Sequence, residues 1–442
     1  MRAGKLAAKV GPVAVLLVGL WVLLSTGLPN PASADVAPGD VINKDNWQKL
    51  EGLVPEPVLS WIKKGDVLEI GTVPYNPAEY MPPGVRDYLE SNQGKYEVNE
   101  EGIIVDVKTG KTPGFIAGLP FPKIDPNEAS AGFKIMHNKN YYTYAAGCID
   151  VPFQVTWIGR NTGKERDIEC QYLTYVLDGD PAQKDLPNPE NIELHSIIRI
   201  LAPFDVKGTN VLLWRYRDNR PDSSFTYVPS IRRVRRMSPA NRSDAFLGTD
   251  FCVDDAWGYA GKVNAFEWKI VKHEDQIVPF FPKDPIPLEK TDKPGEWKTV
   301  NKGSWQPIIG MDKPGYTGAP WFPTNFTWIK RPTYVMECKA KDPYYNYGTQ
   351  YLWVDAEFYQ PTYKVIHDRS GAYWKVEWQC QAAFESPDKQ VRLLGLGTMI
   401  AIDDRTDHAC VLWLVHPRNS TVYWQAQDIN NYSLAGFQSL CK

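Results

Sequence analysis

The sequence predicts an α+β protein built on a large antiparallel β-sheet, and three observations support this. First, 12% of its 442 residues are aromatic, and Pro 36 and Gly 33 are frequent, which is typical of strands joined by turns. Second, helical patterns occur mainly before residue 141, and strand patterns dominate after it. Third, these strands follow one another as a meander. Such a sheet, if strongly curved, encloses either a side-chain core or a ligand cavity.

Composition and charge exclude several classes of protein. The hydrophobic share of 43% and the charged share of 23% are those of an ordinary globular chain. A formal net charge of -3 argues against nucleic acid as a partner bound by bulk charge.

The first element, residues 1–34, has the pattern of a cleaved signal peptide. A basic start precedes the apolar run 10–24, and Ala32-Ser33-Ala34 follows it. The alternative is a membrane anchor, which needs about 20 apolar residues and therefore more than this run provides. We expect an exported, periplasmic protein, with outer-membrane association or an extracellular location as the alternatives.

Residues 35–126 predict an N-terminal extension of short helices and loops. Asn43 or Asp45 can cap a first helix, and a second one ends at Gly65 after two lysines. Proline-rich, irregular segments follow at 71–84 and 112–126.

Residues 127–442 predict the curved sheet domain. A helix is expected over 127–138, and the segment 279–332, dense in proline, glycine and tryptophan, is expected to wrap around the domain. The expected strands are 148–158, 166–177, 197–203, 211–217, 225–236, 266–273, 333–339, 350–358, 362–368, 372–384, 397–403 and 409–416.

No catalytic motif is apparent, so we expect a protein that is not an enzyme. The sequence has no nucleophile elbow, phosphate-binding loop, zinc-protease motif or dinucleotide fingerprint. The six histidines are scattered, and no metal or other cofactor is predicted.

An arginine cluster, Arg232–Arg236, is the most distinctive basic feature. In a strand, Arg233 and Arg235 share one face, where they could hold an anionic head group. The alternative is a structural ion-pair network with nearby acids, namely Asp250, Asp254 and Asp255.

Aromatic residues recur along the strands. They serve either as bulk for a core or as the walls of a ligand cavity, and as a set they exceed what a simple core needs. The candidate ligand-binding residues are Trp214, Tyr216, Phe225, Tyr227, Trp353, Trp374 and Trp378, with Arg233 and Arg235.

Seven cysteines lie after the signal peptide, and export permits disulfides. An odd number leaves at least one cysteine free or paired between chains. Cys148 and Cys170 flank a turn at 161–164, which makes them a plausible local pair.

Motifs spread over most of the chain resemble the domain-of-unknown-function family "thirteen twenty-nine". These motifs are Pro38–Ile42, Leu53–Leu59, Gly118–Pro122, Arg232–Arg236, Trp268–Val271 with Val278-Pro279, Trp353–Asp355 and Asp368–Gly371 with Trp374–Val376. The resemblance implies export by a Gram-negative bacterium and the lipoprotein-carrier (LolA/LolB-like) superfold, a curved half-barrel covered by helices. It also implies hydrophobic cargo, because relatives of this fold carry acyl chains and some family members are encoded beside exporters.

Two non-enzymatic functions follow. The first is a periplasmic carrier for a hydrophobic small molecule or lipid (an acyl chain or sterol-like molecule), serving an envelope transporter or outer-membrane protein. The alternative is a structural or interaction protein of the envelope, which docks a partner through a sheet edge or its aromatic loops.

Overall fold

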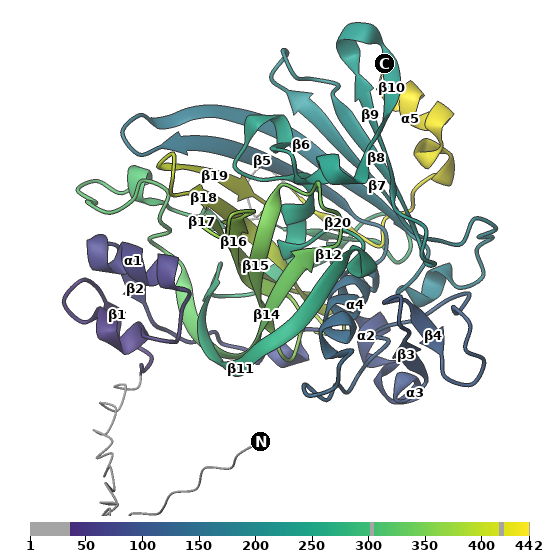
Figure 1. Cartoon of the computed structure of the whole chain (residues 1–442), viewed down its shortest axis with the longest axis horizontal. Coiled ribbons are helices and arrows are strands. Elements are labelled where there is room, and N and C mark those ends of the chain that lie inside the picture. Colours follow the sequence, from purple (N-terminus) through teal and green to yellow (C-terminus); the bar gives the residue numbers. More distant parts are fainter. Residues whose placement is uncertain (1–35, 301–304, 415–419, 442) are drawn as a thin grey trace, which may run out of the picture. The chain divides into compact units, whose positions relative to one another are not determined.

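A large, strongly curved sheet dominates the structure (Figure 1). This computed structural model describes residues 36–300, 305–414 and 420–441, so the predicted signal peptide lies outside the described residues. The strands of the sheet are β5 (Asp150–Gly159), β6 (Gly163–Val176), β7 (Ile192–Ala202), β8 (Asn210–Tyr216), β9 (Ser223–Val228), β10 (Arg233–Met237), β11 (Phe266–Phe280), β12 (Ile286–Lys290), β13 (Trp297–Thr299), β14 (Thr327–Ala340), β15 (Tyr347–Asp355), β16 (Pro361–Asp368), β17 (Tyr373–Glu385), β18 (Arg392–Asp403), β19 (His408–Trp413) and β20 (Val422–Tyr423).

The strands form one continuous antiparallel path. Its order is β10-β9-β8-β7-β6-β5-β19-β18-β17-β16-β15-β14-β11. The far end curls back, because Phe280 of β11 lies beside Gln381 of β17 in a short parallel pairing. The predicted α+β class with a large antiparallel sheet is therefore confirmed.

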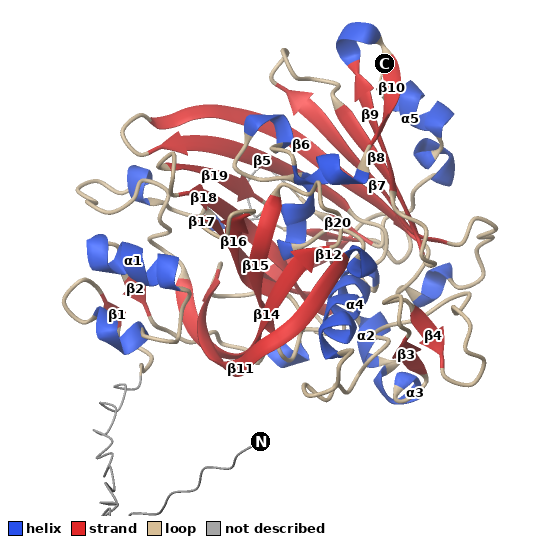
Figure 2. Cartoon of the chain, in the orientation of Figure 1, coloured by secondary structure: helices blue, strands red, loops and turns tan. Residues whose placement is uncertain are grey.

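Figure 2 shows that the helices are short and few beside the strands. They are α1 (Glu56–Lys64), α2 (Pro83–Arg86), α3 (Leu89–Asn92), α4 (Ala131–Tyr144) and α5 (Leu434–Leu440). Two small sheets pair β1 (Val41–Ile42) with β2 (Leu68–Glu69) and β3 (Tyr96–Val98) with β4 (Ile104–Asp106). In the described residues, no helix combines the length and the apolar character needed to cross a membrane.

Several predicted boundaries differ from the structure, and two of the differences have identifiable reasons. The helix expected over 127–138 is α4, which continues through Tyr141 and Tyr144 because packing of these buried rings outweighs their strand preference. The strand expected over 225–236 is the hairpin β9–β10. Pro229 opens its turn, and Arg232 closes it in the left-handed conformation, with φ 53°.

The aromatic excess fills much of the core. Trp378 of β17 packs against Trp61 of α1 and Trp328 of β14, with both centroid separations at 5.3 Å. The ring of Phe322, in the segment between β13 and β14, lies 5.0 Å from the same ring, centroid to centroid. These contacts join α1, the segment between β13 and β14, and the sheet within residues 35–442, which form one compact unit.

The C-terminal segment covers one face of β7–β9. The 3₁₀ turn η11 (Ile429–Tyr432) and α5 lie beside these strands (Figure 1). Trp214 of β8 donates its indole N–H to the Tyr432 carbonyl at 2.7 Å, and Asn210 donates to Cys441 Sγ at 3.0 Å. The opposite face of the same strands is thus the one that can face a cavity.

Candidate functional site: an apolar cavity with a cationic end

A cavity lies between the opposite face of β7 and β8, with neighbouring strands, and a cover formed by α4 and the 3₁₀ turn η7 (Val253–Gly258). The volume of the cavity, counted as the space open to the centre of a water molecule, is about 110 Å³. A single water needs roughly 10–15 Å³ by the same measure. The space therefore suits a small ligand or part of an apolar chain. Its side-chain lining comes from β5–β8, β18, β19, α4, η7 and the segments beside them.

Strand alternation makes most of this wall apolar. On β8, Val211 and Leu213 point into the cavity, whereas Leu212 and Trp214 point to the face that the C-terminal segment covers. Neighbouring strands contribute further apolar side chains in the same way: Phe153, Val176, Leu194, Ile198, Met399 and Leu412.

Three cations interrupt this wall. Arg215 of β8 donates to both carboxylate oxygens of Asp222, at 3.2 Å to Oδ1 and 2.6 Å to Oδ2. Arg242 donates to Asp254 Oδ1 at 2.6 Å. Both guanidinium groups also donate to the Ala260 carbonyl, at 2.6 and 3.1 Å, so the two arginines meet at one point of the cover.

Lys139 of α4 is the third cation. Its Nζ donates to the Tyr259 carbonyl at 2.7 Å and to Asn140 Oδ1 at 3.3 Å. No carboxylate oxygen of the described residues lies within 4.0 Å of Lys139 Nζ. Burial, reinforced by repulsion from Arg215, lowers the pKa of Lys139 to about 7.

The predicted aromatic residues of β8 and β9 do not line this cavity. Trp214 and Phe225 contact each other edge to face at 4.9 Å on the covered side. The Arg220 guanidinium lies over the ring of Tyr216, 4.1 Å from the ring centroid. Tyr227 is buried in the main core.

The other predicted aromatic residues also lie elsewhere. Trp353 donates to Gln276 Oε1 at 3.2 Å, and Trp374 donates to Asp403 Oδ2 at 2.7 Å. Trp378 belongs to the aromatic core described above. None of these three lines the cavity.

Arg233 and Arg235 lie exposed on β10 at the edge of the sheet. The alternative, ion pairs between this cluster and the nearby acids, is wrong, because each acid has another basic partner. Asp250 lies beside His408, Asp254 binds Arg242, and Asp255 binds Lys364. The cluster therefore neither faces the cavity nor joins a buried network with these acids.

The predicted disulfide between Cys148 and Cys170 is not formed, and both thiols are free and buried. The Thr174 amide donates to the Ile149 carbonyl, so Cys148 lies near that end of β6. Cys170 is four residues away from Thr174 along the strand, roughly 13 Å, whereas a disulfide needs Cα atoms within about 7 Å.

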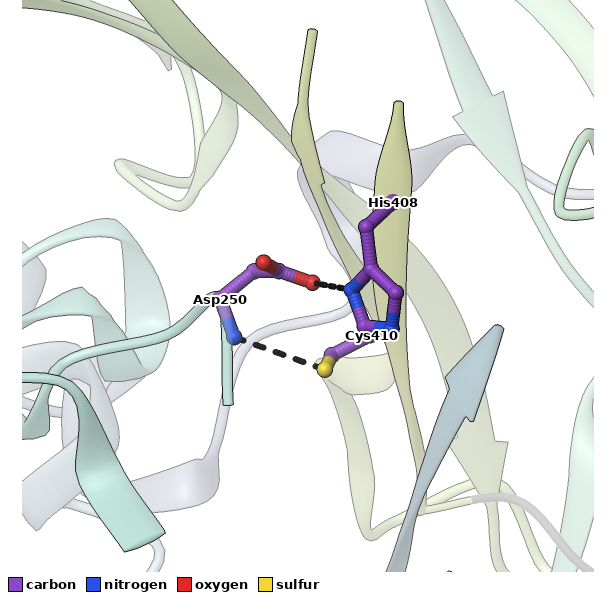
Figure 3. Close-up of side chains that lie close together, drawn as sticks. All are labelled: Asp250, His408 and Cys410. Carbon is purple, nitrogen blue, oxygen red and sulfur yellow. Dashed lines mark hydrogen bonds and ion pairs between the residues drawn. The ribbon is translucent and has the colours of Figure 1, made fainter. Parts of the chain in front are cut away.

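A second polar cluster joins Asp250, His408 and Cys410, whose ligand atoms lie within 4.8 Å of one another (Figure 3). Nitrogen, oxygen and sulfur donors of this kind can bind Zn²⁺. Here His408 Nδ1 lies 2.7 Å from Asp250, and its Nε2 lies 3.4 Å from Glu165. The Asp250 hydrogen bond raises the pKa of His408, and both ring nitrogens of His408 already lie beside a carboxylate. We assign no metal to this cluster.

Sequence reasoning missed the three cavity cations. A signal was present for Arg215, because it interrupts the otherwise apolar stretch from Val211 to Tyr216. No such signal marks Lys139 or Arg242, since tertiary packing alone brings them to the same cavity.

Comparisons with known proteins place the chain in a family. Among solved structures, it resembles a domain described as an outer membrane lipoprotein-sorting protein from Vibrio parahaemolyticus, with 15% identity, TM-score 0.46, 70% of this chain and 100% of that chain covered. It also resembles a DUF1329 family protein from Desulfovibrio piger, with 15% identity, TM-score 0.44 and coverage of 70% and 98%. A LolA superfamily protein from Nitrosomonas europaea follows, with 14% identity, TM-score 0.38 and coverage of 67% and 96%.

A search of curated proteins finds no match. The family model described as "Protein of unknown function (DUF1329)" matches residues 41–434. That match covers most of the chain and agrees with the family that its motifs resemble. The chain therefore belongs to the DUF1329 family.

Proposed function

We propose that this protein is a non-enzymatic periplasmic carrier, which binds a hydrophobic ligand such as a lipid or acyl chain and serves an envelope export system. The observation that carries this proposal is the apolar cavity, whose wall includes alternate side chains from β5–β8 together with side chains of β18 and β19. An apolar wall with a few convergent polar groups is the usual character of a ligand site. The predicted signal peptide supports the periplasmic location.

The alternative, docking of a partner through the sheet edge, has weaker support. The edge strand β10 exposes Arg233 and Arg235, and charged side chains on an edge oppose pairing with a further strand. The cavity therefore remains the better candidate for function.

Binding of the neutral fluorescent probe N-phenyl-1-naphthylamine tests the carrier proposal. We expect saturable binding at about one probe per chain, and we expect Val211→Trp to abolish it because the indole fills space that the probe needs. Fluorescence titration measures both effects. Mass spectrometry of organic extracts from the purified protein should in addition reveal an apolar molecule.

The matched control is Val107→Trp, which makes the same change at a position that is 49% exposed. This variant should bind the probe as the wild type does, and circular dichroism should show both variants folded. Absence of saturable binding to the wild type, or equal binding by a folded Val211→Trp variant, would contradict the proposal.

A further inference from the structure

The cationic end of the cavity carries an excess of positive charge. Arg215 and Arg242 each have a carboxylate partner, but Lys139 is held only by a carbonyl and an amide oxygen. The ionisable groups that influence Lys139, Glu193, Arg242 and Lys262 around this end include five cations and four carboxylates. The cations are Lys139, Arg215, Arg242, Lys262 and Lys364, and the carboxylates are Glu193, Asp218, Asp222 and Asp254.

The imbalance is larger when Glu193 is protonated. Burial raises the pKa of Glu193, and its carboxyl group is held by the Tyr144 hydroxyl at 2.7 Å. With all nine groups ionised, the five cations exceed the four carboxylates by one charge, and protonation of Glu193 adds a second. Because the pKa of Lys139 is lowered to about 7, its own charge is fully present only below that pH. Neither charge is matched within this group.

A buried charge without a counter-ion is costly, and lysine is rarely buried unless it is paired. Lys139 is only 4% exposed, and it lines the same space as Arg215 and Arg242. A negatively charged ligand group would supply the missing counter-ion, and its hydrogen bonds to these cations would be charge-assisted. The remaining wall is apolar and suits a hydrocarbon chain.

We infer that the cavity binds a single-chain amphiphile with an anionic head, a carboxylate or a phosphate, whose head lies at Lys139, Arg215 and Arg242 and whose chain lies between β5–β8 and α4. This inference rests on the proposed carrier function and specifies its class of ligand. It assigns to Lys139 the recognition of charge and to Val211 and Leu213 the recognition of the chain.

Affinities of the wild-type protein for ligands with equal chains and different heads test the inference. Isothermal titration calorimetry would compare dodecanoate, dodecyl phosphate, dodecanol and dodecyltrimethylammonium. We expect at least one of the two anions to bind about tenfold or more tightly than dodecanol, and the cation to bind most weakly. The tighter anion identifies the head as carboxylate or phosphate.

Lys139→Met tests the role of the lysine itself. It should weaken binding of the preferred anion about tenfold and leave dodecanol binding unchanged. Lys134→Met is the matched control, because Lys134 lies on the same helix but is paired with Glu128, and it should preserve anion binding.

Three results would overturn the inference. Equal affinities for dodecanol and both anions would refute the anionic head and leave the carrier function standing. Equal losses of anion and dodecanol binding in Lys139→Met would show that the lysine acts only on the fold. Failure of all four amphiphiles and of the neutral probe to bind would refute the carrier function, and the inference with it.

Discussion

Individual buried side chains make the stability of this protein depend on pH. His137 of α4 is buried, and its Nε2 lies 2.9 Å from the Gly102 carbonyl oxygen. Burial lowers the pKa of His137 to about 4, against 6.5 for the free side chain, although the Gly102 hydrogen bond opposes this shift. The folded protein therefore keeps this ring neutral at pH values where the unfolded chain protonates it.

The sign of the pH effect follows from this difference. Above pH 6.5 the ring is neutral in both states, whereas between about pH 6.5 and 4 only the unfolded chain gains the proton, so stability is lost as the pH falls. The shift corresponds to about 3 kcal/mol. We expect His137→Gln to reduce the slope of unfolding free energy against pH in this window, as measured by urea titration.

His273→Gln is the matched control, because His273 is exposed. Its pH slope should equal that of the wild type. If His137→Gln kept the full wild-type slope, the acid sensitivity would arise from other groups, of which His195, whose pKa burial also lowers to about 4, would be the first to examine.

Among the elements, β10 illustrates how charge protects a sheet. It pairs with β9 alone among the described strands, so it forms the edge of the sheet. Arg233 and Arg235 are exposed along it, and such charges oppose pairing between edges. We therefore expect the arginine cluster to protect this edge, a role that needs no ligand and no acidic partner.

Replacing both arginines tests this role. The double variant Arg233→Thr with Arg235→Thr should self-associate, because threonine favours strands and removes the charge from the edge. Sedimentation velocity should show dimers or larger species at concentrations where the wild type does not form them. Lys108→Thr with Lys111→Thr removes the same charge from exposed positions elsewhere and should leave the wild-type profile unchanged. An unaltered profile for the arginine variant would show that another feature protects the edge.

At the scale of the whole molecule, one sheet joins distant parts of the chain. Strand β5 pairs with β19 along its length, His408 beside Gly159 and Trp413 beside Gln154. The cavity wall therefore combines early and late strands, with α4 and η7 as its cover. Because these parts share one compact unit, ligand binding should stabilise the unit as a whole.

Thermal unfolding measures this coupling. We expect one transition for the wild type, and dodecanol at about 100 times its dissociation constant should stabilise the folded state by about 2.7 kcal/mol and raise the midpoint by a few degrees. The midpoint of Val211→Trp should not respond. Two separate transitions, only one of which shifts with ligand, would contradict a single cooperative unit.

The sequence predicted most strands because alternation is a local property. The segments around β14 to β19 fall where the pattern places them, and α1 ends at Gly65 in the left-handed conformation, with φ 117°, as its sequence suggests. Errors arose where local preference and tertiary contact disagree, as in the extension of α4 through Tyr144. The disulfide was a further error, because sequence proximity across a turn does not fix how far apart two residues lie along paired strands.

The sequence by itself determined that this chain builds a large antiparallel sheet with apolar side chains on both faces of strands such as β8. Only the tertiary structure decided which face meets the cavity. Val211 and Leu213 are as apolar as Leu212 and Trp214, so alternation distinguishes two faces without naming the inner one. Two tertiary contacts distinguish the faces of β8. The C-terminal segment covers the face of Trp214, and α4 packs over the opposite face and places Lys139 there. Such contacts join residues far apart in sequence, and no local pattern records them.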